Sequence, residues 1–224
     1  MIAAVRHRLL RLCFFSSLMA CLFVSAFTVV ALELNDDLIR FIEKRFGAQA
    51  TQRLRQWEKI ANLKTNLDIS EKLSLVNRFF NRAEFVSDIK HWGKEDYWAS
   101  PVELLATNAG DCEDYSIAKY FTLREMGVPI EKMKITYVKA LKLNQAHMVL
   151  AFYPEPGAEP LVLDNLINEI KPASERDDLV PVYSFNGEGL WLSKLRGQEG
   201  KRIGDAKKLE SWQELLDRHR TLMK

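Results

Sequence analysis

Apolar residues recur at helical spacing over the first third of the chain, after an uncharged N-terminal run. The apolar positions with this spacing are Leu38, Ile39, Ile42 and Phe46, followed by Leu73, Val76, Phe79 and Phe80. Asn35 before two aspartates, and Ser70 before Glu71, are typical of helix starts. The pattern therefore predicts a helical lobe over residues 33–100, whose last part, from His91 onward, is an aromatic connecting loop.

From residue 101 onward the pattern changes from helical to mixed. Residues 101–107 and 110–127 predict two helices, the second of which ends at Gly127. Short segments rich in β-branched and aromatic residues predict antiparallel strands at 135–142, 146–153, 161–164, 179–185 and 189–192. An amphipathic helix over 208–223 closes the chain. Residues 101–224 are therefore expected to form an α+β core, in which a helix packs on an antiparallel sheet.

The first 32 residues differ in composition from the rest. Three arginines precede a run from Leu12 to Leu32 without any charged residue, and small residues near Ala31 suit a signal peptidase. This arrangement predicts an export signal over 1–32. The run is also long enough to span a bilayer as an uncleaved anchor. Lipidation at Cys21 is disfavoured because the apolar run continues well past that cysteine.

Composition and charge exclude several classes of protein. Hydrophobic residues at 47% and charged residues at 28% argue against a disordered protein, a coiled coil or a disulfide scaffold. Without the three arginines of residues 1–32, the 32 Lys and Arg fall to 29 against 30 Asp and Glu. The mature chain lacks the clustered basic excess of a nucleic-acid-binding protein, so no nucleic-acid partner is expected.

Cysteine usage singles out one residue. Cys13 and Cys21 lie within the predicted signal, so Cys112 is the one cysteine of the mature chain and has no intramolecular disulfide partner. A lone thiol in an exported protein is either a small buried apolar residue or a reactive group. A redox role is disfavoured because no second cysteine is present to resolve a mixed disulfide.

Cys112, His147 and Asp164 follow one another on successive predicted elements. Cys112 falls in the first turn of the helix over 110–127, where the positive end of the helix dipole favours a thiolate. His147 comes 35 residues later on a strand, and Asp164 a further 17 residues later at the end of the next. A histidine packed against the helix can take the thiol proton, and an aspartate can fix its tautomer. Each residue alone has an ordinary alternative: a core thiol, a hydrogen-bonded core histidine and a turn aspartate.

Three sequence blocks strengthen this constellation. They are Gly110-Asp111-Cys112-Glu113-Asp114, Ala146-His147-Met148-Val149-Leu150 and Val162-Leu163-Asp164-Asn165. In this order the blocks resemble the motifs of the transglutaminase-like superfamily and are most similar to the bacterial transglutaminase-like cysteine proteinases, over roughly Phe85 to Tyr183. The resemblance implies a papain-like or transglutaminase-like core, with Cys112 as nucleophile, His147 as its base and Asp164 as the residue that orients the histidine.

The resemblance also implies a biological role. Proteases of this kind are periplasmic and cleave the N-terminal region of a large surface adhesin at paired alanines through an acyl-enzyme, which releases the adhesin and promotes biofilm dispersal. Their inhibitory partner is the periplasmic domain of an inner-membrane receptor for cyclic di-GMP. They depend on Ca²⁺, through acidic residues beside the nucleophile that here match Asp111, Glu113 and Asp114.

Those acidic residues give a physical reason for the ion. Asp111, Glu113 and Asp114 place up to three negative charges around Cys112, and nearby anions raise the pKa of a thiol. A calcium ion held by these oxygens would neutralise the charges and fix the helix start. The alternative is that Asp111 and Asp114 only cap the helix.

Other assignments stay open at the level of sequence. The oxyanion would bind the backbone N–H of Cys112 and one donor among Asn108, Trp92 and Trp98, and Trp98 is also a candidate for contact with substrate. The same triad would serve an acyltransferase, such as a cross-linking transglutaminase or a peptide N-glycanase relative. A calcium-stabilised binding module without catalysis is the alternative from another class. Asp177 and Asp178 are interpreted as a solvated loop.

Overall fold

The computed structural model describes residues 31–192 and 200–224, apart from residue 65, so the export signal predicted over 1–32 lies almost wholly outside the described residues. The part of the chain from Ala31 to Lys224 is one compact unit. Among the helices of the described residues, none combines the length and the apolar character needed to cross a bilayer.

The helices predicted before residue 84 are present. They are α1 (Asp36–Phe46), α2 (Ala48–Ala61) and α3 (Ile69–Phe80), and the short α4 (Asp88–His91) follows within the connecting region. Asn35 caps α1, because its side chain accepts a hydrogen bond from the Leu38 N–H at 2.7 Å. The start of α3 differs from the prediction: Asp68, rather than Ser70, is the cap, and it forms a reciprocal pair of hydrogen bonds with Glu71. A carboxylate is a strong acceptor for the free N–H groups of a first turn.

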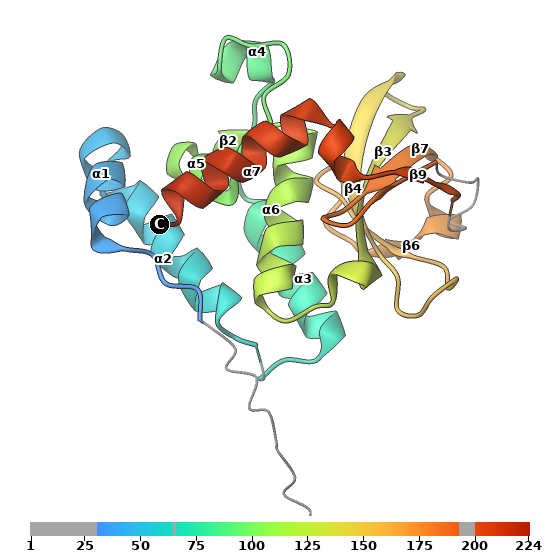
Figure 1. Ribbon diagram of the computed structural model, residues 1–224, viewed down its shortest axis with the longest axis horizontal. Helices are drawn as coiled ribbons and strands as arrows, with labels where there is room; N and C mark the ends of the chain where they lie inside the picture. Colours follow the sequence, from blue (N-terminus) through green and yellow to red (C-terminus); the bar gives the residue numbers. More distant parts are fainter. Residues whose placement is uncertain (1–30, 65, 193–199) are drawn as a thin grey trace, which may run out of the picture. The chain divides into compact units, whose positions relative to one another are not determined.

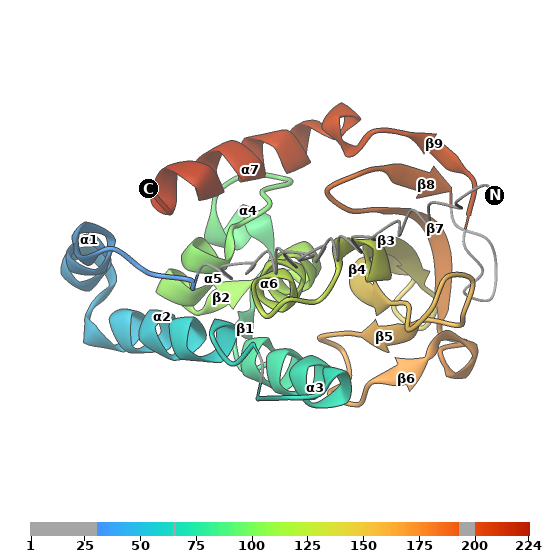
Figure 2. The ribbon, with the colours of Figure 1, turned by 60° about the horizontal axis from the view of Figure 1, so that its bottom comes forward.

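Helix α6 (Cys112–Glu125) is the central helix, and it follows the short helix α5 (Pro101–Thr107). Every residue of α6 from Asp114 to Leu123 is buried, so neighbours cover this helix on all sides. Trp57 of α2 donates its indole N–H to Thr122 of α6 at 2.7 Å, which satisfies two buried polar groups. Figure 2 shows α6 between the helices α2 and α3 and the strands of the sheet.

Seven strands of the described residues form one antiparallel sheet in the order β6-β5-β4-β3-β7-β8-β9 (Figures 1 and 2). The strands are β3 (Met133–Ala140), β4 (Gln145–Phe152), β5 (Leu161–Leu163), β6 (Lys171–Pro172), β7 (Leu179–Phe185), β8 (Leu190–Leu192) and β9 (Arg202–Gly204). Strands β3 and β4 pair so that Val138 faces His147 in register. Helix α6 packs on β4 and β3. The predicted α+β class, with the nucleophile helix on an antiparallel sheet, is confirmed.

Several of the shortest elements are not predicted by the sequence pattern. They are β6 and β9, the parallel pair β1 (Glu84–Phe85) and β2 (Ala109–Gly110), and the 3₁₀ turns Ile130–Lys132, Ala173–Glu175 and Ala206–Lys208. Two or three residues are too few to show a period in the apolar pattern.

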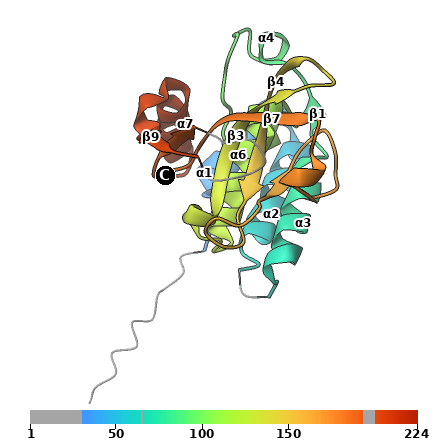
Figure 3. The ribbon, with the colours of Figure 1, turned by 90° about the vertical axis from the view of Figure 1, so that its right-hand side faces the viewer.

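The predicted C-terminal helix is α7 (Glu210–Leu222). It lies on the opposite side of α6 from α2 and α3 (Figures 2 and 3). Trp212 of α7 is buried against the aromatic rings of α6. Arg218 donates a hydrogen bond to the backbone carbonyl of Trp98 and lies 3.6 Å from Glu103 of α5. Helix α7 thereby holds the segment between α4 and α5, which leads to the site described next.

Candidate active site

Cys112 is the first residue of α6, as the sequence predicts. Gly110, at the end of β2, leads the chain into the helix. The side chains of Asp114 and Leu104 approach it so closely that no side chain fits at this position. A Cβ at this position would lie 2.5 Å from Asp114 Oδ2 and 2.8 Å from a Leu104 methyl group. The Gly-Asp-Cys-x-Asp block therefore has a packing role in addition to its chemistry.

Asp114 is fully buried and faces backbone groups. Its carboxylate accepts hydrogen bonds from the N–H groups of Ala99 at 2.6 Å and Asp111 at 3.2 Å. Burial and the charge of Asp111 raise the pKa of Asp114 well above its usual range. The carboxylate thus ties the segment before α5 to the start of α6.

A buried serine joins the nucleophile helix to the histidine strand. Ser116 lies one turn after Cys112, and its Oγ is 3.0 Å from the backbone carbonyl oxygens of both Cys112 and Met148. Met148 follows His147 on β4. The hydroxyl therefore links the helix turn that carries the thiol to the strand that carries the imidazole.

His147 and Asp164 are brought together as predicted. His147 Nε2 lies 2.8 Å from Asp164 Oδ1, and both side chains are buried, with exposed fractions of 2% and 0%. The same oxygen accepts the N–H of Leu166 at 3.0 Å. Burial alone would raise the pKa of Asp164, but its hydrogen bonds to His147, Leu166 and Arg176 outweigh burial and lower the pKa to about 2. Asp164 is therefore an ionised acceptor at neutral pH.

The second oxygen of Asp164 is bound by a buried arginine. Arg176 donates from Nη2 to Asp164 Oδ2 at 2.7 Å, and its side chain is 3% exposed. Arg176 also donates two hydrogen bonds to Asp178, each of 2.9 Å. The interpretation of Asp177 and Asp178 as a solvated loop is therefore wrong for Asp178, because its carboxylate is an acceptor for a buried guanidinium.

A cleft of about 690 Å³ opens beside Cys112 and His147. Its lining combines the two reactive side chains with aromatic, apolar and polar groups. The other lining residues are Phe85, Asp96, Trp98, Asp111, Glu113, Tyr137, Leu143, Gln145, Ala146, Met148, Asn165, Leu166 and Tyr183. Tyr137 and Tyr183 stack face to face, with ring centroids 5.0 Å apart. Phe85, Leu143 and Leu166 are 42–54% exposed and form an apolar rim.

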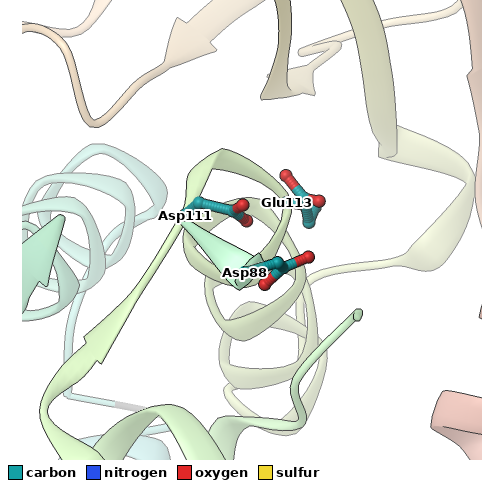
Figure 4. A group of neighbouring side chains, drawn as sticks. All are labelled: Asp88, Asp111 and Glu113. Carbon is teal, nitrogen blue, oxygen red and sulfur yellow. The ribbon is translucent and has the colours of Figure 1, made fainter. Parts of the chain in front are cut away.

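Three carboxylates gather near the start of α6 (Figure 4). Asp88, Asp111 and Glu113 each offer an oxygen, and these oxygens lie within 4.8 Å of one another. One oxygen of Asp88 and one of Asp111 are buried without a hydrogen-bond partner. The sequence predicts Asp111, Glu113 and Asp114 as ligands. The structure gathers the first two with Asp88, and Asp114 is outside the group because it faces backbone amides.

Burial and mutual repulsion raise the pKa values of these carboxyls. Burial raises the pKa of Asp88 to about 6, and the charges of Asp111 and Asp96 add to this effect. The hydrogen bond from the Tyr97 N–H acts in the opposite direction. The pKa of Asp111 rises to about 8, through burial first and then its hydrogen bond and charge interaction with Glu113. Burial raises the pKa of Glu113 as well. Such a group of carboxyls favours bound protons or a bound cation. Its donor atoms are all oxygens, two of them buried without a hydrogen-bond partner, which fits a hard cation.

The thiol of Cys112 is held as a neutral donor in this arrangement. Its Sγ donates a hydrogen bond to Glu113 Oε2 at 3.0 Å. Burial raises the pKa of the Cys112 thiol far above its usual range, and the charges of Glu113 and Asp111 add to this effect. A backbone hydrogen bond with Met148 acts in the opposite direction. The conflict that the sequence predicts, between a nucleophile and its acidic neighbours, is present in the geometry.

The structure narrows the candidates for an oxyanion donor. Of the three side chains considered beside the Cys112 amide, Trp98 is in the lining of the cleft, whereas Trp92 and Asn108 are not. The indole N–H of Trp98 is donated to Asp96 at 2.9 Å. Gln145, two residues before His147, adds an exposed side-chain amide to the cleft.

The structure adds three residues to the candidate site that the sequence analysis does not name. Asp88 and Arg176 lie outside the three sequence blocks, and nothing in their local sequence points to the site. Ser116 does have a signal, because its spacing of four residues from Cys112 puts both on one face of α6.

Comparisons with known proteins agree with this geometry. The family described as bacterial transglutaminase-like cysteine proteinase matches residues 43–193. Three solved structures of Legionella pneumophila LapG are similar to this chain at 41–42% identity. The match to the EGTA-treated form covers 87% of this chain and 100% of the LapG chain, with a TM-score of 0.73. The match to a second form covers 84% of this chain and 95% of LapG, with a TM-score of 0.71. The match to the calcium-bound form covers 82% of this chain and 98% of LapG, with a TM-score of 0.68. The search of curated proteins gave no match. With the family match over most of its length and relatives above 40% identity, the chain belongs to the bacterial transglutaminase-like cysteine proteinase family.

Proposed function

We propose that this protein is a calcium-dependent cysteine endopeptidase in which Cys112, His147 and Asp164 form the catalytic triad. The observation that carries the proposal is the 2.8 Å hydrogen bond between His147 Nε2 and Asp164 Oδ1, next to a cleft lined by His147 and Cys112. Membership of a cysteine proteinase family supports the same chemistry.

The hydrogen bond between His147 and Asp164 supports a separate role for each ring nitrogen of His147. Because Nε2 donates to the ionised Asp164, Nδ1 is the nitrogen left to take the proton of Cys112. The thiolate then adds to the carbonyl carbon of the scissile peptide, and the C–N bond breaks as the imidazolium returns its proton to the leaving amine. A water molecule deprotonated by the same histidine hydrolyses the thioester and restores the thiol. The Cys112 N–H and a second donor in the cleft stabilise the oxyanion.

Asp88, Asp111 and Glu113 are the residues that would hold the calcium ion. When bound, the ion supplies the positive charge that offsets repulsion among these carboxylates and the cost of a thiolate beside them. Glu113 now accepts the hydrogen bond of the Cys112 thiol, and as a ligand it would release that thiol to His147. The calcium-bound and EGTA-treated structures of the similar protein LapG support the choice of ion.

The proposed substrate is the N-terminal region of a large surface adhesin, cleaved at paired alanines, with release of the adhesin and biofilm dispersal as the result. The proposed location is the periplasm, reached through the signal predicted over 1–32. The proposed inhibitory partner is the periplasmic domain of an inner-membrane receptor for cyclic di-GMP. The family resemblance and the similarity to LapG support these proposals. An open cleft with an apolar rim also suits an extended peptide with small side chains.

The test is to incubate the purified protein with the N-terminal region of a candidate adhesin that contains paired alanines. Wild type with calcium should produce two fragments, and both EGTA and the Cys112→Ala variant should prevent cleavage. Replacement of the paired alanines by bulky residues should abolish the cut. An added amine donor distinguishes a protease from an acyltransferase. Incorporation of the amine without hydrolysis of the peptide would contradict the assignment as a protease. Fragments that persist with Cys112→Ala would contradict the triad.

A further inference from the structure

A chain of buried charges extends the triad beyond Asp164. Asp164 Oδ1 serves His147 and the Leu166 N–H, so Oδ2 is the oxygen that remains for other donors. Arg176 binds this oxygen at 2.7 Å and is itself held by two hydrogen bonds to Asp178. The side chain of Asp178 is 22% exposed, against 3% for Arg176, so the chain of charges runs from the buried imidazole toward the surface.

We propose that Arg176 is a positioning residue for His147: it fixes the carboxylate plane of Asp164 so that Oδ1 faces Nε2, and Asp178 orients the guanidinium. The inference rests on the proposed function, in which His147 acts through Nδ1. It adds two residues that lie outside the three sequence blocks.

The geometry calls for an arginine rather than for any cation. A guanidinium is planar and offers several N–H groups in fixed directions, so one side chain can bind two carboxylates at once. Nη2 is shared between Asp164 and Asp178, while Nε bonds to Asp178 alone. A lysine at this position would keep the charge but would lose the fixed angle between the two carboxylates.

Other charged groups near Asp164 do not provide this constraint. Lys119 of α6 is buried and its charge interacts with Asp164, but the donors to the Asp164 carboxylate are His147, Leu166 and Arg176. Asn81 donates to the backbone carbonyl of Asp164 at 2.8 Å and fixes the main chain, not the carboxylate. The rotation of the carboxylate about its own axis is therefore set by His147 and the Leu166 N–H on one oxygen and by Arg176 on the other.

The alternative is that Arg176 has only a structural role and stabilises the attachment of its own loop, between the 3₁₀ turn Ala173–Glu175 and β7, to the sheet. Asp178 also contributes its backbone carbonyl to Leu141 at the end of β3, so the loop has a structural attachment that does not need the guanidinium. A purely structural role predicts a loss of stability with an unchanged imidazole. A positioning role predicts a changed imidazole even where the fold is retained.

The experiment compares Arg176→Lys, Arg176→Met and Asp178→Asn in the full protein labelled with ¹⁵N-histidine. Arg53→Met is the matched control, because Arg53 donates to the carbonyls of Leu105 and Ala106 at the end of α5, away from the triad. The ring N–H signal of His147 and its exchange with solvent are measured by NMR in EGTA. Peptide cleavage is measured in calcium.

Arg176→Met is expected to lose the protected Nε2–H signal of His147 and to lower kcat about 10–100-fold, with KM changed less than about twofold, as for a misplaced catalytic group. Arg176→Lys and Asp178→Asn should give smaller changes of the same kind, and Arg53→Met should leave the signal intact. An unchanged His147 signal and kcat in folded Arg176→Lys and Asp178→Asn would overturn the inference, whether or not Arg176→Met folds. A wild type that cleaves no peptide would instead overturn the proposed function, and the NMR comparison would still test Arg176.

Discussion

Two groups of charged side chains flank the thiol of Cys112, and they are built in opposite ways. In the chain formed by His147, Asp164, Arg176 and Asp178, which we call the paired relay, each carboxylate has a basic partner within 2.9 Å. In the group formed by Asp88, Asp111 and Glu113, which we call the acidic cluster, the three charges have the same sign. Two of its oxygens are buried without a partner.

The same residue type therefore behaves differently in the two groups. Hydrogen bonds and opposite charge overcome burial for Asp164 and lower its pKa to about 2. Burial and the neighbouring carboxyl raise the pKa of Asp111 to about 8. The fold itself supplies the counter-charge for the paired relay, whereas the acidic cluster requires protons or a cation from solution. The charges on one side of the candidate active site are thus balanced within the folded chain, and those on the other side are not.

The largest effect is expected from Asp164→Asn, which breaks the paired relay. An amide offers a neutral acceptor or an N–H donor to His147 Nε2, and the donor orientation stabilises the wrong imidazole tautomer. We expect kcat for peptide cleavage to fall on the order of 10³–10⁴-fold, as when a triad aspartate is replaced. Asp177→Asn, an exposed neighbour of the relay, is the control and should keep full activity. A loss below tenfold in Asp164→Asn would show that the relay does not set the tautomer.

An aspartate-to-asparagine substitution in the acidic cluster should make the chelated protein more stable. Asp88 is 3% exposed, and its pKa of about 6 means that its charge is unfavourable in the folded chain at pH 7.5. Asp88→Asn in EGTA is therefore expected to raise the free energy of unfolding by about 1–3 kcal/mol, since each pKa unit corresponds to about 1.4 kcal/mol. It should also remove most of the stabilisation that calcium provides. Denaturant unfolding with and without calcium measures both effects.

Asp96→Asn is the matched control for this variant. Asp96 also lines the cleft, but it accepts hydrogen bonds from Trp98 and Ser211 and lies outside the acidic cluster. Its replacement removes a neighbouring charge but none of the three clustered carboxylates, so the calcium response should change much less than in Asp88→Asn. If Asp88→Asn destabilises the chelated protein, or leaves the calcium response intact, Asp88 is not a member of a cation site.

The two groups also differ in how far the sequence predicts them. Cys112, His147 and Asp164 are predictable because each belongs to a local block on its own element, and the pairing of β3, β4 and β5 brings the blocks together. Asp88 and Arg176 are not, because Asp88 begins the four-residue helix α4 and Arg176 follows a 3₁₀ turn, and the positions of both short elements depend on tertiary contacts. Residue spacing along the sequence predicts which strand packs on a helix, but it does not predict where the side chain of a residue in a short connecting segment lies.

The prediction of Asp114 as a calcium ligand shows a second limit of what the sequence can predict. A carboxylate in the first turn of a helix is compatible with capping and with metal binding, and the sequence does not distinguish the two. The difference is set by Ala99, whose N–H approaches Asp114 from a segment that α7 holds through Arg218. Whether a first-turn carboxylate is a ligand therefore depends on residues more than 100 positions away.

Calcium should stabilise the protein more strongly as the pH rises. The pKa values of Asp88 and Asp111 are raised to about 6 and about 8, so the folded chain binds these protons more tightly than the unfolded chain. The resulting stability is fully present below about pH 4 and is lost as the pH rises through 6 to 8. Because calcium replaces the protons, the calcium-induced gain in Tm should grow by several degrees between pH 5 and 8. Buried His219, whose pKa is lowered to about 4, contributes equally with and without calcium.

The control for this pH dependence is the double variant Asp88→Asn and Asp111→Asn. It removes two of the three carboxylates of the acidic cluster and leaves only Glu113, so the calcium-induced gain in its Tm should be small at every pH. Thermal unfolding of both proteins at several pH values, in calcium and in EGTA, gives the comparison. A calcium-induced gain that is the same at pH 5 and pH 8 in the wild type would contradict the proposed competition between protons and the ion.

The smallest effect is expected at Ser116, which joins the nucleophile helix to the paired relay. Ser116→Ala removes the hydroxyl that lies 3.0 Å from the carbonyls of Cys112 and Met148, and the loss of one buried hydrogen bond costs about 1 kcal/mol. Because His147 is adjacent to Met148, kcat should fall a few-fold while the calcium-induced gain in Tm is unchanged, since the acidic cluster does not contact this hydroxyl. Thr122→Ser, which keeps a hydroxyl for Trp57 on the same helix, is the control for a small change in the core. A change in the calcium response of Ser116→Ala would show that the two groups of charges are coupled through α6 and do not act independently on Cys112.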